Sequence, residues 1–394
     1  MKQRLTLLLL AASFFVGCSD DTDTTAAPDA TVDSAASDAQ PQADAMAPDP
    51  APPIGSLTQD GWNEILPGGD TICSRGTEFA YYVHPGTTNK VIIDFIGGGA
   101  CWNNLTCSVA DSIFSDSVDG VRAVVRAGVG VGIYDREREE NPFKDWTHVI
   151  IPYCTGDIHW GNRTTAYGEG DRAVTINHRG AVNTRAVLDW VYTNIEAPEQ
   201  IFVTGCSAGS YGSLAWSAYI MEQYPGVPVI QFGDSGAGVI TETFFRDSFP
   251  SWNAEDMLPS WIDGLNPAMV DIFTLELADL YRYIGAQYPT NTMSQYNTTF
   301  DNNQTFYYTA MGGEGGAEGW STGMTGMTGR IIESTPNYLN FQAPGEQHCI
   351  IVQPNFYTVE SNGVKLVDWL SDLIDGEPVE NITCTDCSRD TPGT

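Results

Sequence analysis

Four short runs of apolar residues occur along the chain, each bounded by polar or turn-forming residues. They lie at residues 91–96, 148–151, 200–204 and 228–232. Runs of this length, rich in Val, Ile and Phe and with few polar interruptions, are typical of strands buried on both faces of a parallel sheet. The pattern therefore predicts a mostly parallel sheet in the interior of the protein.

Two segments beside these strands have the apolar spacing of helices. One lies in residues 177–195, and the other covers residues 211–224 and ends at Pro225. Strands that alternate with helices predict an α/β fold, here an α/β-hydrolase-like three-layer sandwich with a mostly parallel central sheet. In such sheets the reactive groups gather at the carboxyl ends of the strands.

The N-terminus has the pattern of an export signal. Lys2 and Arg4 precede an apolar run at 5–16 that is too short to span a bilayer stably, and this run leads into Cys18. We expect a lipoprotein signal peptide over 1–18, with Cys18 carrying the lipid that anchors the exported protein to the bacterial outer membrane or cell surface. An ordinary signal peptide that contains a cysteine is the alternative.

The rest of the chain divides by composition. Residues 19–55 consist largely of Ala, Asp, Pro, Thr and Ser, which predicts a disordered tether. Residues 56–394 have a globular composition, and we expect a single domain there. That domain has 42 acidic against 16 basic residues, so it repels nucleic acid and anionic head groups. The membrane is expected to be a partner only through the lipid at Cys18.

The chain has nine cysteines. With Cys18 set aside as the lipid carrier, eight remain, an even number that predicts up to four disulfides in an exported protein. A cytosolic chain with the same cysteines would have suggested metal sites. We expect no metal and no organic cofactor.

One motif carries the signature of a catalytic nucleophile. Residues 205–209 read Gly-Cys-Ser-Ala-Gly and match G-x-S-x-G, with the strand at 200–204 before them and a helix after them. This strand–turn–helix context is what a nucleophile elbow requires, since the sharp turn lifts the serine to the top of the sheet. The motif makes Ser207 the candidate nucleophile.

A serine nucleophile needs a base, and in the α/β-hydrolase order the base comes last. His348 alone of the five histidines follows Ser207 in the sequence. Both residues have a cysteine neighbour, Cys206 and Cys349, so a meeting of Ser207 with His348 would also bring these cysteines together. We expect a Cys206–Cys349 disulfide, against the alternative of two buried thiols.

The remaining parts of a hydrolase site have candidates as well. Oxyanion donors are expected from the Ala208 amide and from the glycines at 97–99, which follow the first strand. A phosphate cradle is the other use of such a glycine run, but the lysine of a P-loop is absent. Asp234 and Asp301 are both candidates for the triad acid, and the spacing alone does not separate them.

Four blocks of the chain together resemble the pectinacetylesterase family. They occur in the family's order, and the likeness extends over residues 61–376. The blocks are Gly-Gly-Gly-Ala-Cys-Trp at 97–102, Pro-Tyr-Cys-Thr-Gly-Asp-Ile-His-Trp-Gly at 152–161, the serine motif at 205–209 and Asp-Ser-Gly at 234–236.

The resemblance implies specific roles for matching residues. It implies Ser207 as the nucleophile, His348 as the base and Asp301 as the acid, because Asp301 lies in a Phe-Asp-Asn segment before the histidine. It also implies oxyanion amides at Gly98 and Gly99, together with Ala208.

Disulfides and further site residues are implied in the same way. The resemblance suggests the pairs Cys101–Cys107 and Cys73–Cys154, which leave Cys384 and Cys387 as a terminal pair. His159 and Trp160 follow a strand end, where they either line the substrate pocket or have a structural role.

Two features depart from the family pattern. The acidic domain fits poorly with binding polygalacturonate, and the glycine-rich segment 312–329 looks like an insert that is either a mobile lid or a disordered loop.

The predicted function is that of a serine esterase for acetyl or other short-chain esters, with acetylated polysaccharide as a candidate substrate. The alternatives are another serine hydrolase (a lipase, polyester depolymerase or peptidase) and an inert surface binding protein. The oligomeric state is not predicted.

Overall fold

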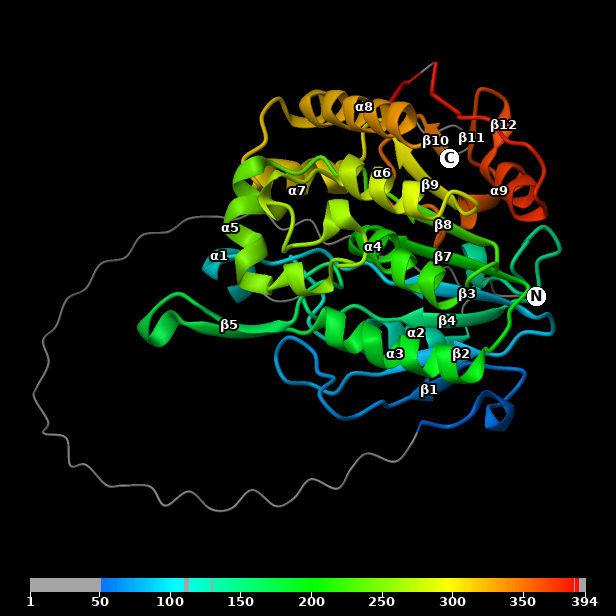
Figure 1. Cartoon of the computed structure of the whole chain (residues 1–394), viewed down its shortest axis with the longest axis horizontal. Helices are drawn as coiled ribbons and strands as arrows, with labels where there is room; N and C mark the ends of the chain where they lie inside the picture. Colours follow the sequence, from blue (N-terminus) through cyan, green and yellow to red (C-terminus); the bar gives the residue numbers. More distant parts are fainter. Residues whose placement is uncertain (1–50, 110–112, 129, 386, 390–394) are drawn as a thin grey trace, which may run out of the picture. The chain divides into compact units, whose positions relative to one another are not determined.

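The computed structural model describes residues 51–109, 113–128, 130–385 and 387–389. Its central element is an eight-stranded sheet in the order β1-β2-β4-β3-β7-β8-β9-β10 (Figure 1). Strands β1 and β2 are antiparallel to their neighbours, and the other six are parallel. The strands are β1 (Asn63–Ile65), β2 (Tyr81–His84), β3 (Lys90–Phe95), β4 (Thr147–Ile151), β7 (Gln200–Cys206), β8 (Val229–Asp234), β9 (Thr292–Thr298) and β10 (Tyr338–Ala343).

Successive side chains of the sheet enter two separate cores, because neighbouring residues of a strand point to opposite faces. On β3, Val91 and Ile93 belong to one core and Ile92 to the other. Helices α3, α4, α6 and α8 cover the first face, and α9 with the loops around it covers the second (Figure 1). These three layers confirm the predicted α/β-hydrolase fold.

Nine helices are present in the described residues, and α4 begins directly after the serine motif. They are α1 (Asn104–Ser108), α2 (Asp119–Ala127), α3 (Gly180–Asn194), α4 (Ala208–Gln223), α5 (Glu242–Trp252), α6 (Leu277–Gln287), α7 (Asn302–Ala310), α8 (Gly316–Ser334) and α9 (Leu366–Asp375). None of the helices in these residues is both long and apolar enough to cross a membrane.

Two small hairpins complete the fold. They are β5 (Arg163–Tyr167) with β6 (Val174–His178), and β11 (Glu360–Ser361) with β12 (Val364–Lys365). The first projects from the body of the domain below α5 (Figure 1).

The end of the segment that was expected to be a tether packs against the domain. The indole of Trp190 donates to the carbonyl of Pro52 at 2.8 Å, and the Ile54 amide donates to the side chain of Asn194 at 2.9 Å. Residues 51–55, which were expected to belong to the tether, therefore pack against α3. The expected signal peptide, with Cys18, lies outside the described residues.

The glycine-rich segment 312–329 is mostly helical, which corrects the expectation of a lid or a disordered loop. Its greater part belongs to α8 (Gly316–Ser334), and Trp320, Met324 and Met327 are buried against the domain. Close packing favours glycine at position 323, because a β-carbon there would lie 2.7 Å from a methyl carbon of Val239.

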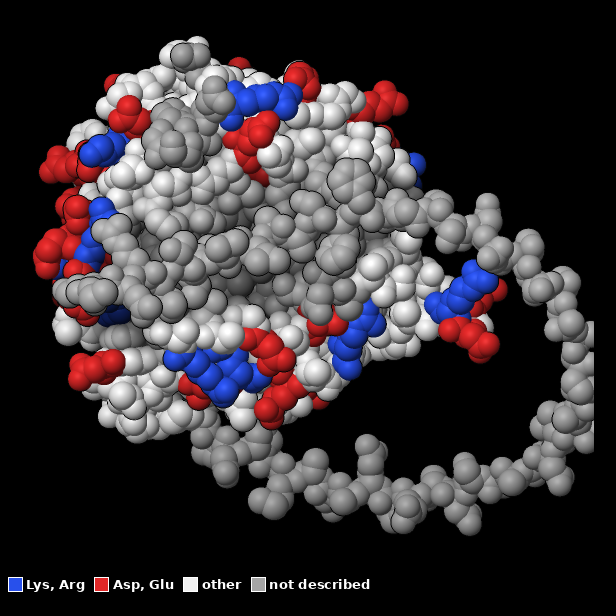
Figure 2. All heavy atoms as spheres, turned by 180° about the vertical axis from the view of Figure 1, so that it is seen from behind, with Lys and Arg blue, Asp and Glu red and all other residues white. Residues whose placement is uncertain are grey.

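The charged side chains lie mostly around the margin of the face shown in Figure 2, many of them red beside blue. Ion pairs of the described residues include Arg122 with Glu64 and Arg389 with Glu346. Among the described residues, both groups of three side chains close enough to hold a metal ion contain cysteine and histidine. The excess of carboxylates thus forms no such cluster in this part of the chain.

Candidate active site

Ser207 occupies the sharp turn between β7 and α4. Its backbone has φ 56° and ψ −121°, a conformation that a residue with a side chain rarely adopts. The turn is possible because Gly209 has no side chain, since a β-carbon there would collide with the carbonyl oxygen of Phe95. The Ser207 amide donates to the Asp234 carbonyl at 2.9 Å and fixes the turn to β8.

His348 is bound to Asp301 through one ring nitrogen. Nδ1 lies 2.8 Å from Oδ2 and 3.0 Å from Oδ1 of Asp301, whose side chain is fully buried. A hydrogen bond to a carboxylate requires the proton on Nδ1. The other nitrogen, Nε2, is buried and has no hydrogen-bond partner among the described residues. In the neutral ring it is therefore a free acceptor.

Asp301 is itself held in place by the start of α7. As the N-cap residue of that helix, it accepts hydrogen bonds from the amides of Asn303 and Gln304 at 2.9 and 2.8 Å. The side-chain amide of Gln304 donates to the second carboxylate oxygen at 3.1 Å. The carboxylate thus keeps one orientation toward His348.

Ser207 lies where two cavities meet. One contains His348 and the glycine loop Gly97–Gly99, and Ser207 lines this cavity too. The other is largely apolar and is lined by side chains that include Trp102, Phe244, Met311 and Trp320. The structure therefore brings Ser207 and His348, 141 positions apart in the printed sequence, to the same cavity.

The candidate oxyanion donors surround the same point. Gly98 and Gly99 line the cavity of His348, and Gly99 and Ala208 line the apolar cavity. Ala208 is the first residue of α4, a position whose amide has no acceptor within the helix. Gly99 has φ 73°, and a β-carbon there would collide with the Ile113 carbonyl and the Tyr307 hydroxyl. Glycine is thus required at this position.

His159 and Trp160 do not line either cavity, which corrects one of the two roles expected for them. Both side chains are buried. His159 Nε2 donates to the Ile96 carbonyl at 2.9 Å, and the Trp160 indole donates to the Tyr211 carbonyl at 3.1 Å. Burial lowers the pKa of His159 to about 4, so the ring is neutral. The neighbour Ile158 reaches the apolar cavity instead.

Part of the chain matches a known protein family. Residues 67–251 match the family model described as Pectinacetylesterase. This region belongs to the pectinacetylesterase family. Planarian (Schmidtea mediterranea) palmitoleoyl-protein carboxylesterase NOTUM is 28% identical over 147 residues, 36% of this chain and 27% of that protein. Arabidopsis thaliana pectin acetylesterase 5 is 25% identical over 167 residues, 39% of this chain and 36% of that protein.

The alignments with these two relatives thus span about a quarter of the first relative's length and about a third of the second's. Crystal structures extend the likeness in fold beyond the aligned region. Two crystal forms of the Drosophila Wnt deacylase Notum match with TM-scores of 0.60 and 0.61, at 18% and 17% identity. They cover 85% of this chain and 98% and 99% of theirs, so the chain shares the Notum fold over most of its length.

Three disulfides are present in the described residues, and all three were predicted. Cys206–Cys349 joins the nucleophile turn to the residue after His348, across 143 positions of sequence. Cys73–Cys154 and Cys101–Cys107 are the two pairs that the family resemblance implied. The Cys387 thiol lies 2.9 Å from the Cys384 carbonyl oxygen.

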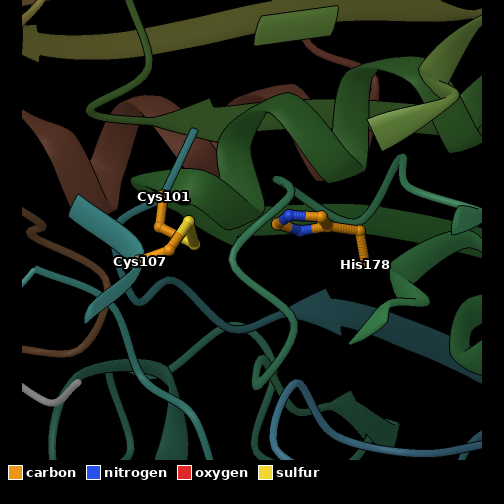
Figure 3. Close-up of side chains that lie close together, drawn as sticks. All are labelled: Cys101, Cys107 and His178. Carbon is orange, nitrogen blue, oxygen red and sulfur yellow. A yellow bond between two sulfur atoms is a disulfide. The ribbon is translucent and has the colours of Figure 1, made fainter. Parts of the chain in front are cut away.

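One of the cysteine–histidine groups lies away from Ser207. Figure 3 shows the Cys101–Cys107 disulfide beside the ring of His178. His178 Nε2 lies 2.8 Å from the Tyr167 hydroxyl, and Nδ1 lies 2.9 Å from the Thr155 carbonyl. Both ring nitrogens are occupied and the sulfurs are bonded to each other, so this group is structural.

Sequence reasoning missed the contribution of α7. Asn303 and Tyr307 line both cavities, and Gln304 lines the apolar one. The signal was present in their spacing, because residues 303 and 307 lie four apart and share a helix face once Asp301 is taken as the helix start.

Proposed function

We propose that the chain is a serine carboxylesterase in which Ser207 is the nucleophile, His348 the base and Asp301 the acid. One observation carries this proposal. A histidine whose Nδ1 is bonded to a buried carboxylate has its Nε2 unbound, and it lines the same cavity as a serine in a strained turn. These are the roles that nucleophile, base and orienting acid take in serine hydrolases.

The chemistry follows from these positions. Nε2 of His348 accepts the proton of Ser207 as its oxygen attacks the ester carbonyl, and Asp301 stabilises the imidazolium that forms. The imidazolium then gives this proton to the departing alcohol, and the acyl group stays on Ser207 as an acyl-enzyme. A water molecule, deprotonated by the same nitrogen, releases the acid. The amides of Gly98, Gly99 and Ala208 stabilise the oxyanion in both steps.

The apolar cavity is the better fit for the acyl group, and its size limits the length of that group. The space open to the centre of a water-sized sphere is about 70 Å³. This space is small beside the about 410 Å³ of the cavity next to His348, so it suits a short acyl chain.

The cavity beside His348 suits the alcohol part of the ester. Its corresponding space is about 410 Å³, and it is lined by the glycine loop and by the polar side chains of Ser115 and Asn303. A larger and more polar space of this kind accommodates a sugar unit, as in an acetylated polysaccharide. The acidic surface disfavours a polyanionic chain such as pectate.

The acyl preference gives a first prediction. In a series of p-nitrophenyl esters, we expect kcat/KM to be highest between acetate and hexanoate and about tenfold lower at dodecanoate, because the longer chain exceeds the cavity. Met311→Ala enlarges the cavity at its partly buried edge and should move the optimum to longer chains. The control Phe306→Ala removes an exposed ring of α7 that lines neither cavity, and it should keep the wild-type profile. An optimum at dodecanoate or beyond in the wild type would contradict the short acyl site.

The hydrolase assignment itself is tested by covalent labelling. A fluorophosphonate probe should modify the protein once, with the label on the tryptic peptide that contains Ser207, because only an activated serine reacts quickly. An unlabelled but folded protein would favour the inert binding protein. Hydrolysis of casein, without any turnover of esters, would favour a peptidase.

We also propose that the protein is exported and anchored by lipid at Cys18. The three disulfides support an oxidising compartment.

A further inference from the structure

A second buried aspartate, Asp234, binds the turn that follows His348. Its Oδ2 accepts hydrogen bonds from the amides of Ile350 and Ile351 at 2.7 and 2.9 Å. Its Oδ1 accepts the hydroxyl of Ser235 at 2.8 Å, and that hydroxyl oxygen accepts the amide of Cys349 at 3.0 Å. Three consecutive amides after the catalytic histidine are thus bound by two neighbouring side chains at the end of β8.

The backbone on both sides is shaped for this contact. Cys349 has φ 59°, and its amide and the two that follow point toward Ser235 and Asp234. Consecutive amides in such a turn form an anion-binding concavity. Ser235 has φ 58° and its amide donates to the Tyr296 carbonyl at 2.8 Å, which fixes it to β9. A carboxylate in such a concavity makes charge-assisted hydrogen bonds, the stronger kind.

Asp234 also contacts the nucleophile turn. Its carbonyl accepts the amide of Ser207 at 2.9 Å, and it lies opposite Cys206 in the register of β7 and β8. One residue therefore binds the turn of Ser207 through its backbone and the turn of His348 through its side chain. The Cys206–Cys349 disulfide joins the same two turns covalently.

We propose that Asp234 is a positioning residue that sets the placement of His348 relative to Ser207. The proposal rests on the catalytic roles proposed above for these two residues. Asp234 takes no part in proton transfer, because its carboxylate is occupied by the turn and by Ser235, while Asp301 occupies the imidazole. Without its charge the amides of Ile350 and Ile351 lose a charge-assisted acceptor, and the base is placed less accurately.

The charge state of Asp234 links this contact to pH. Burial raises the pKa of Asp234 to about 6, while the bonds from Ile351 and Ser235 and the nearby His348 act in the opposite direction. On β9 the titratable group that faces Asp234 is the hydroxyl of Tyr296. Burial raises the pKa of this hydroxyl well above its usual range. Asp234 therefore loses its charge as the pH falls through about 6.

Loss of this charge does not by itself unfold the protein. A raised pKa means that the folded state binds this proton more tightly than the unfolded state, so the contribution of Asp234 to the free energy of unfolding increases as the pH falls from about 6 to 4. An activity that falls more steeply than one proton predicts below about pH 6, in a protein that remains folded, is thus the expected signature of a loosened turn.

The test is Asp234→Asn in the full chain, with p-nitrophenyl acetate and with rates divided by the folded fraction from circular dichroism. We expect kcat at about pH 8 to fall about 100-fold and KM to stay within about threefold, because a displaced base slows chemistry more than binding. Below about pH 6, kcat/KM should fall less steeply in the variant than in the wild type, because the charge is already absent.

Asp157→Asn is the matched control. Asp157 is equally buried, burial raises its pKa to about 6 as well, and it accepts the amides of His159 and Gly180, in a part of the fold away from the His348 turn. We expect the kcat of Asp157→Asn to stay within about threefold of wild type, and its kcat/KM to fall below about pH 6 as steeply as that of the wild type. If Asp234→Asn does not fold, Ser235→Ala decides in its place, with an expected kcat loss of about five- to tenfold, since it removes only the acceptor of the Cys349 amide.

The opposite result would be an Asp234→Asn protein whose kcat lies within about threefold of wild type and whose kcat/KM falls with pH as in the wild type. It would show that the disulfide alone positions the turn. That outcome overturns this inference and leaves the esterase proposal intact. The esterase proposal is decided separately by labelling and by replacement of Ser207.

Discussion

Ser207→Ala should lower kcat for p-nitrophenyl acetate by about 10⁵-fold or more, because it removes the only atom that forms the acyl-enzyme. The loss is this large because His348 and Asp301 act only through that oxygen. Folding should be affected little, since alanine carries the same β-carbon as serine at φ 56°. Steady-state rates and thermal melts on the same samples measure both effects.

Ser217→Ala provides a matched control for this experiment. Ser217 is a fully buried serine of α4, the helix that follows Ser207; its hydroxyl donates to the Leu214 carbonyl, and it lines neither cavity. We expect its kcat within about twofold of wild type. A Ser207→Ala protein that keeps more than about 1% of the wild-type kcat would remove Ser207 from the mechanism.

The parts of the fold that the sequence predicted are those where local pattern and tertiary environment agree. The strands at 91–96 and 200–204 are apolar on both faces because both faces are covered, and they became β3 and β7. The serine motif was recognisable because its glycines are required by local collisions, as at Gly209. Chain order then singled out His348, and the adjacent cysteines supplied a distance restraint, which the disulfide bears out.

Strands β9 and β10 were not predicted, because their buried positions are polar. Gln295 donates to the Gly236 carbonyl at 3.2 Å and accepts from Asn297 at 3.3 Å, so these amides satisfy one another inside the sheet. A buried polar group is stable only when its partners are in place, and those partners come from distant parts of the chain. The hydrophobic pattern alone does not reveal such strands.

The helix α8 was missed for a related reason. Each glycine in a helix interior costs about 1 kcal/mol relative to alanine, so a glycine-rich segment is typical of a loop. Here the absence of side chains lets the helix approach Val239 at Gly323, and burial of Trp320 and Met324 offsets the cost. This compensation depends on tertiary packing and is not visible in the local sequence.

The two candidate acids also illustrate the limit of sequence reasoning. Asp234 and Asp301 are both fully buried and both contact the His348 region, one through backbone amides and the other through the imidazole. From spacing alone they are equivalent, and only the geometry separates an acid that orients the ring from one that holds its turn.

This separation leads to the second prediction with a large effect. Asp301→Asn should lower kcat by about 10³- to 10⁴-fold, because the amide favours the tautomer with the proton on Nε2, which cannot then accept the proton of Ser207. The fold should survive, since asparagine is as good an N-cap as aspartate and can accept the same amides at the start of α7. Asp301→Ala lacks that cap and should lose about 1 kcal/mol of stability in addition.

The comparison of the kcat losses in Asp301→Asn and Asp234→Asn best distinguishes the roles of the two aspartates. With rates per folded molecule, Asp301→Asn should lose at least about tenfold more kcat than Asp234→Asn, because a wrong tautomer removes the base whereas a loosened turn only displaces it. The reverse order would make Asp234 the triad acid, and its contacts with Ile350 and Ile351 would then have to rearrange during catalysis. Equal losses would mean that both carboxylates act by stabilising the imidazolium, which contradicts the division of roles proposed for them.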